Sequence, residues 1–131
     1  MTSREWNTAV GTGLLRVAAG TALLRWRKEL ATGLAGAADD DRVVPALFTY
    51  FGVRDIVVGL ITLASTRPDG NVAKAVTLQG HADATDAAIV AEVVRRGHIP
   101  RERGVAAMAV AGLSALGEYL TALQLRRNSR T

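Results

Sequence analysis

The sequence predicts an all-α fold, a four-helix transmembrane bundle formed by one domain of 131 residues. Three observations lead to this prediction. Long apolar stretches alternate with short segments rich in Gly, Pro and charge. The last apolar stretch lacks the broad polar face that a soluble amphipathic helix needs. Lys and Arg gather in the separating segments, where they would anchor loops beside a membrane.

The first predicted helix covers residues 9–26 and has a tryptophan near each end. Trp6 and Trp26 stand twenty residues apart, which corresponds to about 30 Å along a helix, close to the hydrocarbon thickness of a bilayer. Indole rings favour the boundary between lipid and water, although two ordinary core or surface tryptophans would give the same spacing.

The other three helices are predicted over residues 43–64, 72–94 and 105–125. Residues 43–64 carry only the adjacent charges Arg54 and Asp55. The stretch 72–94 is too polar to pass a hydropathy threshold alone, so we expect its polar face to be covered by the other helices. In the last helix, Ser114, Glu118 and Thr121 form one narrow stripe that would point inward.

Composition limits the classes of partner and cofactor. A soluble all-α domain is the competing prediction, because the mean hydropathy is only +0.17. The chain has no cysteine and no glycine-rich phosphate loop, so we expect no cofactor and no metal. The net charge of +4 comes from short clusters rather than one basic stripe, which disfavours nucleic acid. The expected partners are the lipid bilayer, a lipophilic small molecule, and a second copy or another membrane protein.

Two predicted helices place a charge between glycines on one face. The two sets are Gly13, Arg16, Gly20 and Gly52, Asp55, Gly59. Glycine lets helix backbones approach closely, and an unpaired charge in hydrocarbon is too costly to leave alone. The pattern predicts an Arg16–Asp55 ion pair, with Arg54 turned toward a different neighbour.

The segment GHADATDA at 80–87 allows two interpretations. On one continuous helix, Asp83 and Asp86 share a face with Gln79 and Val90, and His81 could relay protons for an inward acid pair. Alternatively, a helix begins near residue 83, with Asp83 or Thr85 as its N-cap and His81 in a surface loop. A metal site is the weakest interpretation, because HxDxxD matches no zinc spacing. We expect His98 to face solvent and assign it no function.

With FGVRDIVVGLITL at 51–63 and GHADATDA at 80–87, the chain resembles a family of small, uncharacterised four-helix integral membrane proteins, similar in organisation to DoxX-like membrane proteins. The shared marks are Gly52, Arg54 and Asp55 in the second helix and Asp83 and Asp86 in the third. The resemblance implies a multi-pass protein of the cell membrane. It implies no redox activity for this chain, which has neither cysteine nor a redox ligand set.

Three functions fit these residues. The first is an accessory or structural membrane subunit held together by a buried Arg/Asp network. The second is an acid–base enzyme that opens an epoxide, cyclises or isomerises a lipophilic substrate. The third is a proton-coupled carrier. The candidate catalytic residues are Asp83, Asp86, Arg54, Asp55, His81 and Glu118. An internal cavity lined by these groups would favour the enzyme, and a packed interior would favour the accessory subunit.

Overall fold

The computed structural model describes residues 2–128, and this part of the chain is helical with no strand. The long helices are α1 (Ser3–Arg25), α3 (Val43–Ala64), α4 (Val72–Arg95) and α5 (Arg101–Asn128). Between α1 and α3 the chain forms the short helix α2 (Arg27–Glu29) and one π-helical segment, η1 (Leu30–Leu34). The predicted all-α class is confirmed.

The long helices start where capping groups are available. α1 begins before the predicted residue 9, because the Thr2 hydroxyl accepts a hydrogen bond from the Glu5 amide and Glu5 accepts one from the Thr2 amide. The side chain of Asn71 caps α4 by accepting a hydrogen bond from the Lys74 amide at 2.9 Å.

The helix α4 continues without interruption through the segment GHADATDA. The interpretation that a helix begins near residue 83 is therefore wrong. The Thr85 hydroxyl donates back to the His81 carbonyl at 2.8 Å, which is how a threonine inside a helix satisfies its donor. His81, Asp83 and Asp86 therefore lie on one continuous helix, and the helical repeat decides toward which side of α4 each side chain points.

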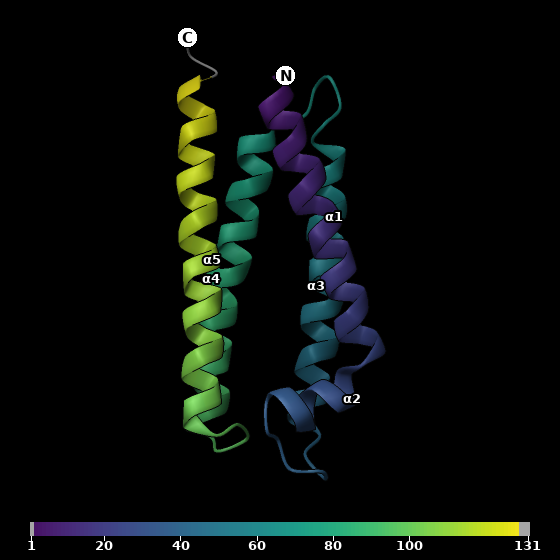
Figure 1. Ribbon diagram of the computed structural model, residues 1–131, viewed down its shortest axis with the longest axis vertical. Helices are drawn as coiled ribbons and strands as arrows, with labels where there is room; N and C mark the ends of the chain where they lie inside the picture. The colour runs from purple at the N-terminus through teal and green to yellow at the C-terminus, as the bar shows by residue number, and fades with distance from the viewer. Residues whose placement is uncertain (1, 129–131) are drawn as a thin grey trace.

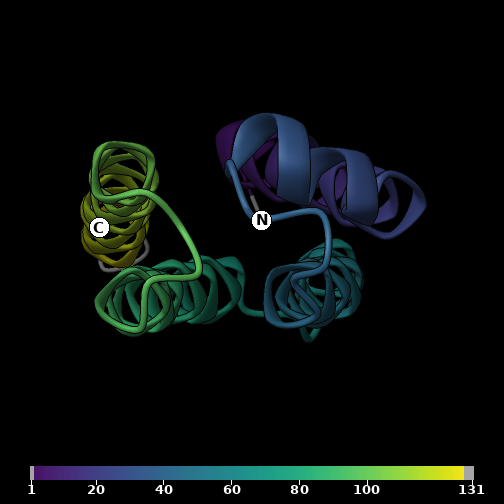
Figure 2. The same cartoon turned by 90° about the horizontal axis from the view of Figure 1, so that it is seen from below.

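The long helices form two closely packed antiparallel pairs (Figure 1). α1 packs along α3 and α4 packs along α5, while contacts between the two pairs are far fewer. Seen from below, the pairs stand apart across the middle of the molecule (Figure 2). The N-terminus, the C-terminal end of α5 and the 65–71 connection lie at one end, and residues 26–42 and 96–100 lie at the other.

The backbones of α1 and α3 approach each other closely because glycines lie where the two helices cross. A Cβ atom added at Gly20 would stand 2.5 Å from the carbonyl oxygen of Gly52, and one added at Gly59 would stand 2.7 Å from that of Gly13. Both distances are shorter than a van der Waals contact, so larger side chains at these positions would push the backbones apart.

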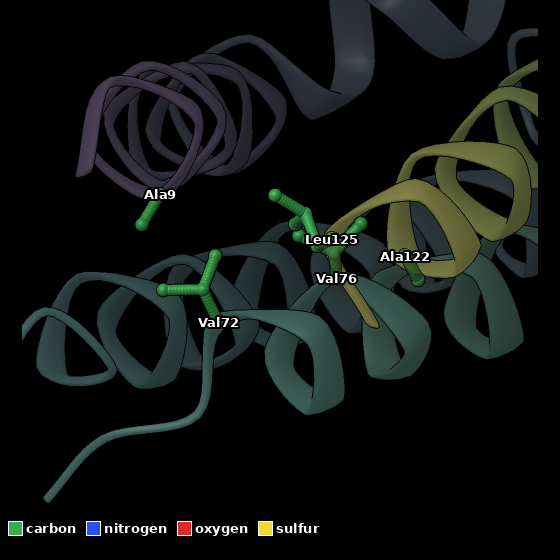
Figure 3. Close-up of a cluster of buried hydrophobic side chains, with 5 residues drawn as sticks. All are labelled: Ala9, Val72, Val76, Ala122 and Leu125. Atoms are coloured by element: carbon green, nitrogen blue, oxygen red, sulfur yellow. The ribbon is translucent and has the colours of Figure 1, made fainter. Parts of the chain in front are cut away.

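Apolar clusters hold the two pairs together at their ends. Near the termini the cluster is Ala9, Val72, Val76, Ala122 and Leu125 (Figure 3). At the opposite end the cluster is Ala31, Ala37, Val44 and Val93. The polar groups of the interior lie between these two clusters.

Two helices are long and apolar enough to cross a membrane, namely Val43–Ala64 and Arg101–Arg127. Within the described residues α1 and α4 do not meet the same criterion. For α4 this agrees with the expectation that its hydropathy alone would fail. Only 28% and 11% of the apolar windows in the two candidate spans are buried against the rest of the protein.

Candidate functional site

A cavity of about 930 Å³ lies between the two helix pairs. Residues from α1, η1, α3, α4 and α5 line it, and most of its wall is apolar. The part of the cavity nearer the chain termini is lined by ionisable residues, namely Arg16, Asp55, Asp83, Asp86 and Glu118. The interior is therefore not fully packed, and its open space adjoins buried charges.

Arg16 is the centre of this charged cluster and is only 9% exposed. Its Nη1 donates to Asp55 Oδ1 at 2.9 Å, and its Nη2 donates at 2.7 Å to both Asp83 Oδ1 and Glu118 Oε1. The structure thus contains the predicted Arg16–Asp55 pair. One side chain of α1 also binds carboxylates from α4 and α5, so Arg16 connects all four long helices.

Arg54 forms the second centre of positive charge. Its Nη1 contacts Asp86 Oδ1 and donates to the Ala82 carbonyl at 3.2 Å, and its Nη2 donates to Asp55 Oδ1 at 2.7 Å. Arg54 does reach a different neighbour, Asp86 of α4, as predicted, but its long side chain also binds the carboxylate of the adjacent Asp55, which the sequence did not indicate. Asp55 therefore accepts from both arginines, while Arg54 is absent from the cavity wall.

The face of α4 that carries the acids points inward as expected. Gln79, Asp83, Asp86 and Val90 all line the cavity. Asp83 is bound by Arg16 and Asp86 by Arg54, so each acid of the pair has its own arginine. The two carboxylates therefore bind different guanidinium groups, although they lie only three residues apart in the sequence.

His81 lies outside the charged cluster. Its side chain is on the exposed face of α4, where Nδ1 stands 2.8 Å from the Tyr119 hydroxyl of α5 and the rings meet edge to face. The structure does not bring His81 to Asp83 or Asp86 as a proton relay. Within residues 2–128 no group of three or more His, Asp and Glu side chains is arranged to hold a metal ion.

Gln79 is a polar residue of the site that the sequence did not single out for a role. It is completely buried, and its Nε2 donates to Thr62 Oγ1 at 2.8 Å and to Thr12 Oγ1 at 3.3 Å. Both threonine hydroxyls donate to carbonyls of their own helices, Thr62 to Val58 and Thr12 to Thr8. One feature of the sequence could have indicated this role. Gln79 lies one helical turn before Asp83 on a helix face that is otherwise largely apolar.

His98 does not simply face solvent, contrary to the sequence prediction. Its Nδ1 lies 2.7 Å from Asp41 Oδ2, and its side chain is 30% exposed. Asp41 also accepts hydrogen bonds from the Val44 and Val43 amides at the start of α3. The amide of Val44, together with His98 and Val43, lowers the pKa of Asp41. Asp41 and His98 thus stabilise the N-terminal end of α3, away from the charged cluster.

Comparison of the chain with protein-family models, characterised proteins and solved structures found no match. These comparisons give no support to the resemblance to DoxX-like membrane proteins. The function must therefore be inferred from the cavity and its charged cluster.

Proposed function

We propose that the chain is a multi-pass integral membrane protein with four spanning helices, and that it binds a lipophilic small molecule for acid–base chemistry. The molecule would enter the cavity between the helix pairs and place its polar group against the charged cluster. The observation that carries this proposal is an apolar cavity of about 930 Å³ with buried carboxylates and arginine along one part of its wall. Isomerisation, cyclisation and epoxide opening are candidate reactions, because each is promoted by a positioned acid or base.

The outward faces of α3 and α5 support the membrane part of the proposal. Most of their apolar windows are not covered by protein, and Leu113 and Leu116 of α5, which do not line the cavity, are 70% and 54% exposed. A core helix of a soluble protein would instead be largely buried. A continuous apolar surface of this kind requires lipid or another protein to cover it.

The charges of α1 and α4 do not oppose this arrangement, because those near the helix centres face inward. Arg16 of α1 and Asp83 of α4 are buried, and Asp86 is partly buried. The charged residues on exposed faces, such as Arg4, Arg25 and Lys74, lie near helix ends. Low hydropathy in these helices therefore comes largely from groups that lipid would not meet.

The geometry changes the roles expected from the sequence. Arg54 does not line the cavity, because its guanidinium group is bound to the Ala82 carbonyl and to Asp55. We therefore assign stabilisation of developing negative charge to Arg16, which lines the cavity. Glu118 also lines the cavity, and among residues 2–128 its Oε2 has no hydrogen-bond partner. We therefore assign proton exchange with the bound molecule to Glu118, with Asp83 beside it on the same arginine.

A purely structural subunit fits this interior less well. The arginine network could join the helices in such a subunit, but that role gives no reason for a cavity beside the network. Cavities in membrane interiors forfeit packing contacts, which are a main source of helix association in lipid. A ligand that fills the cavity would restore those contacts.

Untargeted lipid and metabolite profiling of cells tests the catalytic role. Glu118→Gln removes the charge of the residue assigned to proton exchange at nearly constant shape, and we expect it to abolish the conversion of one lipophilic metabolite. Glu92→Gln is the matched control, since Glu92 does not line the cavity and pairs with the exposed Arg95 and Arg96. Identical profiles for wild type and Glu118→Gln at equal expression would refute catalysis.

A second pair of variants tests the cavity itself. Ala111→Phe places a ring in the cavity from α5, whereas Leu113→Phe places the same ring on the exposed face of that helix. We expect only Ala111→Phe to reproduce the altered profile. Membrane location is tested separately by alkaline extraction, and release of the wild-type chain into the aqueous fraction would contradict the proposal.

A further inference from the structure

The charges of the cluster do not balance when all its groups are ionised. Four carboxylates stand against the guanidinium groups of Arg16 and Arg54, which leaves an excess of two negative charges; the carboxylates are Asp55, Asp83, Asp86 and Glu118. Uncompensated charge in a low-dielectric interior is too costly to remain. The excess must be balanced by protons or by a cation that enters the cavity.

Arg103 also lines the cavity but does not supply this balance. It stands fifteen residues before Glu118 on α5, which corresponds to about 22 Å along the helix. Its Nη1 donates to the carbonyls of Gly33 and Leu34 at 2.7 and 3.1 Å. Arg103 is therefore committed to the opposite end of the cavity.

Hydrogen-bonding groups of the cavity wall show the same imbalance. Gln79 Oε1 and Glu118 Oε2 are buried acceptors without a partner in the described part of the chain, and both residues line the cavity. The orientation of the Gln79 amide is fixed, because Thr12 and Thr62 have already donated their hydroxyl protons and can only accept from Nε2. A buried acceptor of this kind calls for a donor from a ligand or a water.

Between the charged cluster and Arg103 the cavity wall is largely apolar. Beyond the charged cluster its wall includes Leu47, Phe48, Val90, Val93 and Ile99. Asp83 and Val93 mark the extent of this section on α4, ten residues or about 15 Å along the helix. The cavity thus has one acceptor-rich, negatively charged end and one hydrocarbon-like section.

We infer that the ligand is a lipophilic cation, with an ammonium group at the charged end and an apolar chain along the rest of the cavity. This inference rests on the proposed function and specifies the class of molecule that the cavity takes. An ammonium group supplies both positive charge and N–H donors for Gln79 Oε1 and Glu118 Oε2. A carboxylate or phosphate would add acceptors and negative charge, so it would be excluded.

Isothermal titration of the full chain in phosphatidylcholine nanodiscs tests this class directly. The probes are dodecylammonium, dodecanol and dodecanoate, which share one chain length and differ in charge, and empty nanodiscs give the lipid background. We expect dodecylammonium to bind at least about tenfold more tightly than dodecanol, since buried acceptors and charge discriminate against groups that cannot pair with them. Dodecanoate should bind most weakly.

Variants show whether the preference comes from the named residues. Glu118→Gln should remove most of the preference for dodecylammonium over dodecanol, whereas Glu92→Gln should retain it. If Glu118→Gln does not fold, Gln79→Leu tests the second acceptor, and the same reduction is expected. A folded variant that keeps the full preference would overturn the assignment.

The outcomes separate the ligand class from the proposed function. Equal binding of dodecanol and dodecylammonium, blocked by Ala111→Phe but not by Leu113→Phe, would overturn the cationic ligand and leave the lipophilic cavity intact. Absence of Ala111-sensitive binding for all three probes would overturn both.

Discussion

The crossing of α1 and α3 gives the sharpest test of how packing positions the charged cluster. Gly20→Ala adds a Cβ atom that would lie 2.5 Å from the Gly52 carbonyl oxygen, so the backbones must separate by about 0.9 Å to restore the 3.4 Å of an ordinary contact. Arg16 and Asp55 lie on these same two helices, joined by a 2.9 Å hydrogen bond. The substitution should therefore loosen both the packing and the cluster.

The matched control is Gly11→Ala on the same helix, where an added Cβ atom would meet nothing within 4 Å. Because both variants gain the same helix propensity, the difference between them isolates the contact. Overpacking typically costs about 1–3 kcal/mol. For a chain of this size that difference corresponds to roughly 4–12 °C in melting temperature.

Thermal unfolding in detergent, followed by circular dichroism, measures this difference. We expect Gly20→Ala to melt well below Gly11→Ala and to bind ligand more weakly. Equal melting temperatures for the two variants would refute the close backbone contact. The description of α1 and α3 as a glycine-mediated pair would then have to be abandoned.

Three further predictions concern the cluster and its surroundings. Arg16→Met leaves three carboxylates without their shared partner and should destabilise the protein by about 3–5 kcal/mol, whereas Arg95→Met on the surface should change the melting temperature little. Asp41→Ala removes the carboxylate that accepts from the first two amides of α3, a role like that of an N-cap, and should cost about 1 kcal/mol at pH 7. Since folding lowers the pKa of Asp41, its contribution is present above the unfolded value of about 3.9 and is lost as pH falls through the folded pKa, so the difference in melting temperature between wild type and Asp41→Ala should shrink as the solution is made more acidic. His81→Phe should leave ligand binding unchanged, because His81 contacts Tyr119 on the outer surface; a large loss of binding in titration would contradict its placement.

Local pattern was sufficient to predict the helices and part of the site. Apolar stretches separated by Gly, Pro and charge gave the four long helices to within a few residues at most ends. Helical periodicity placed Gln79, Asp83, Asp86 and Val90 on one face, and all four line the cavity. Glycines flanking Arg16 and Asp55 identified the close helix pair and its ion pair. These features depend on residues only a few positions apart, which is why they can be read from the chain.

Only the tertiary structure decided how the charges are shared and where the space lies. Arg16 binds acids from three other helices, Arg54 reaches back to Asp55, and His81 turns to Tyr119 instead of the cluster. Long side chains can reach several neighbours, so sequence spacing cannot choose among them. The cavity likewise follows from the looser contact between the two helix pairs. That space depends on distances between segments far apart in the chain, which no local pattern encodes.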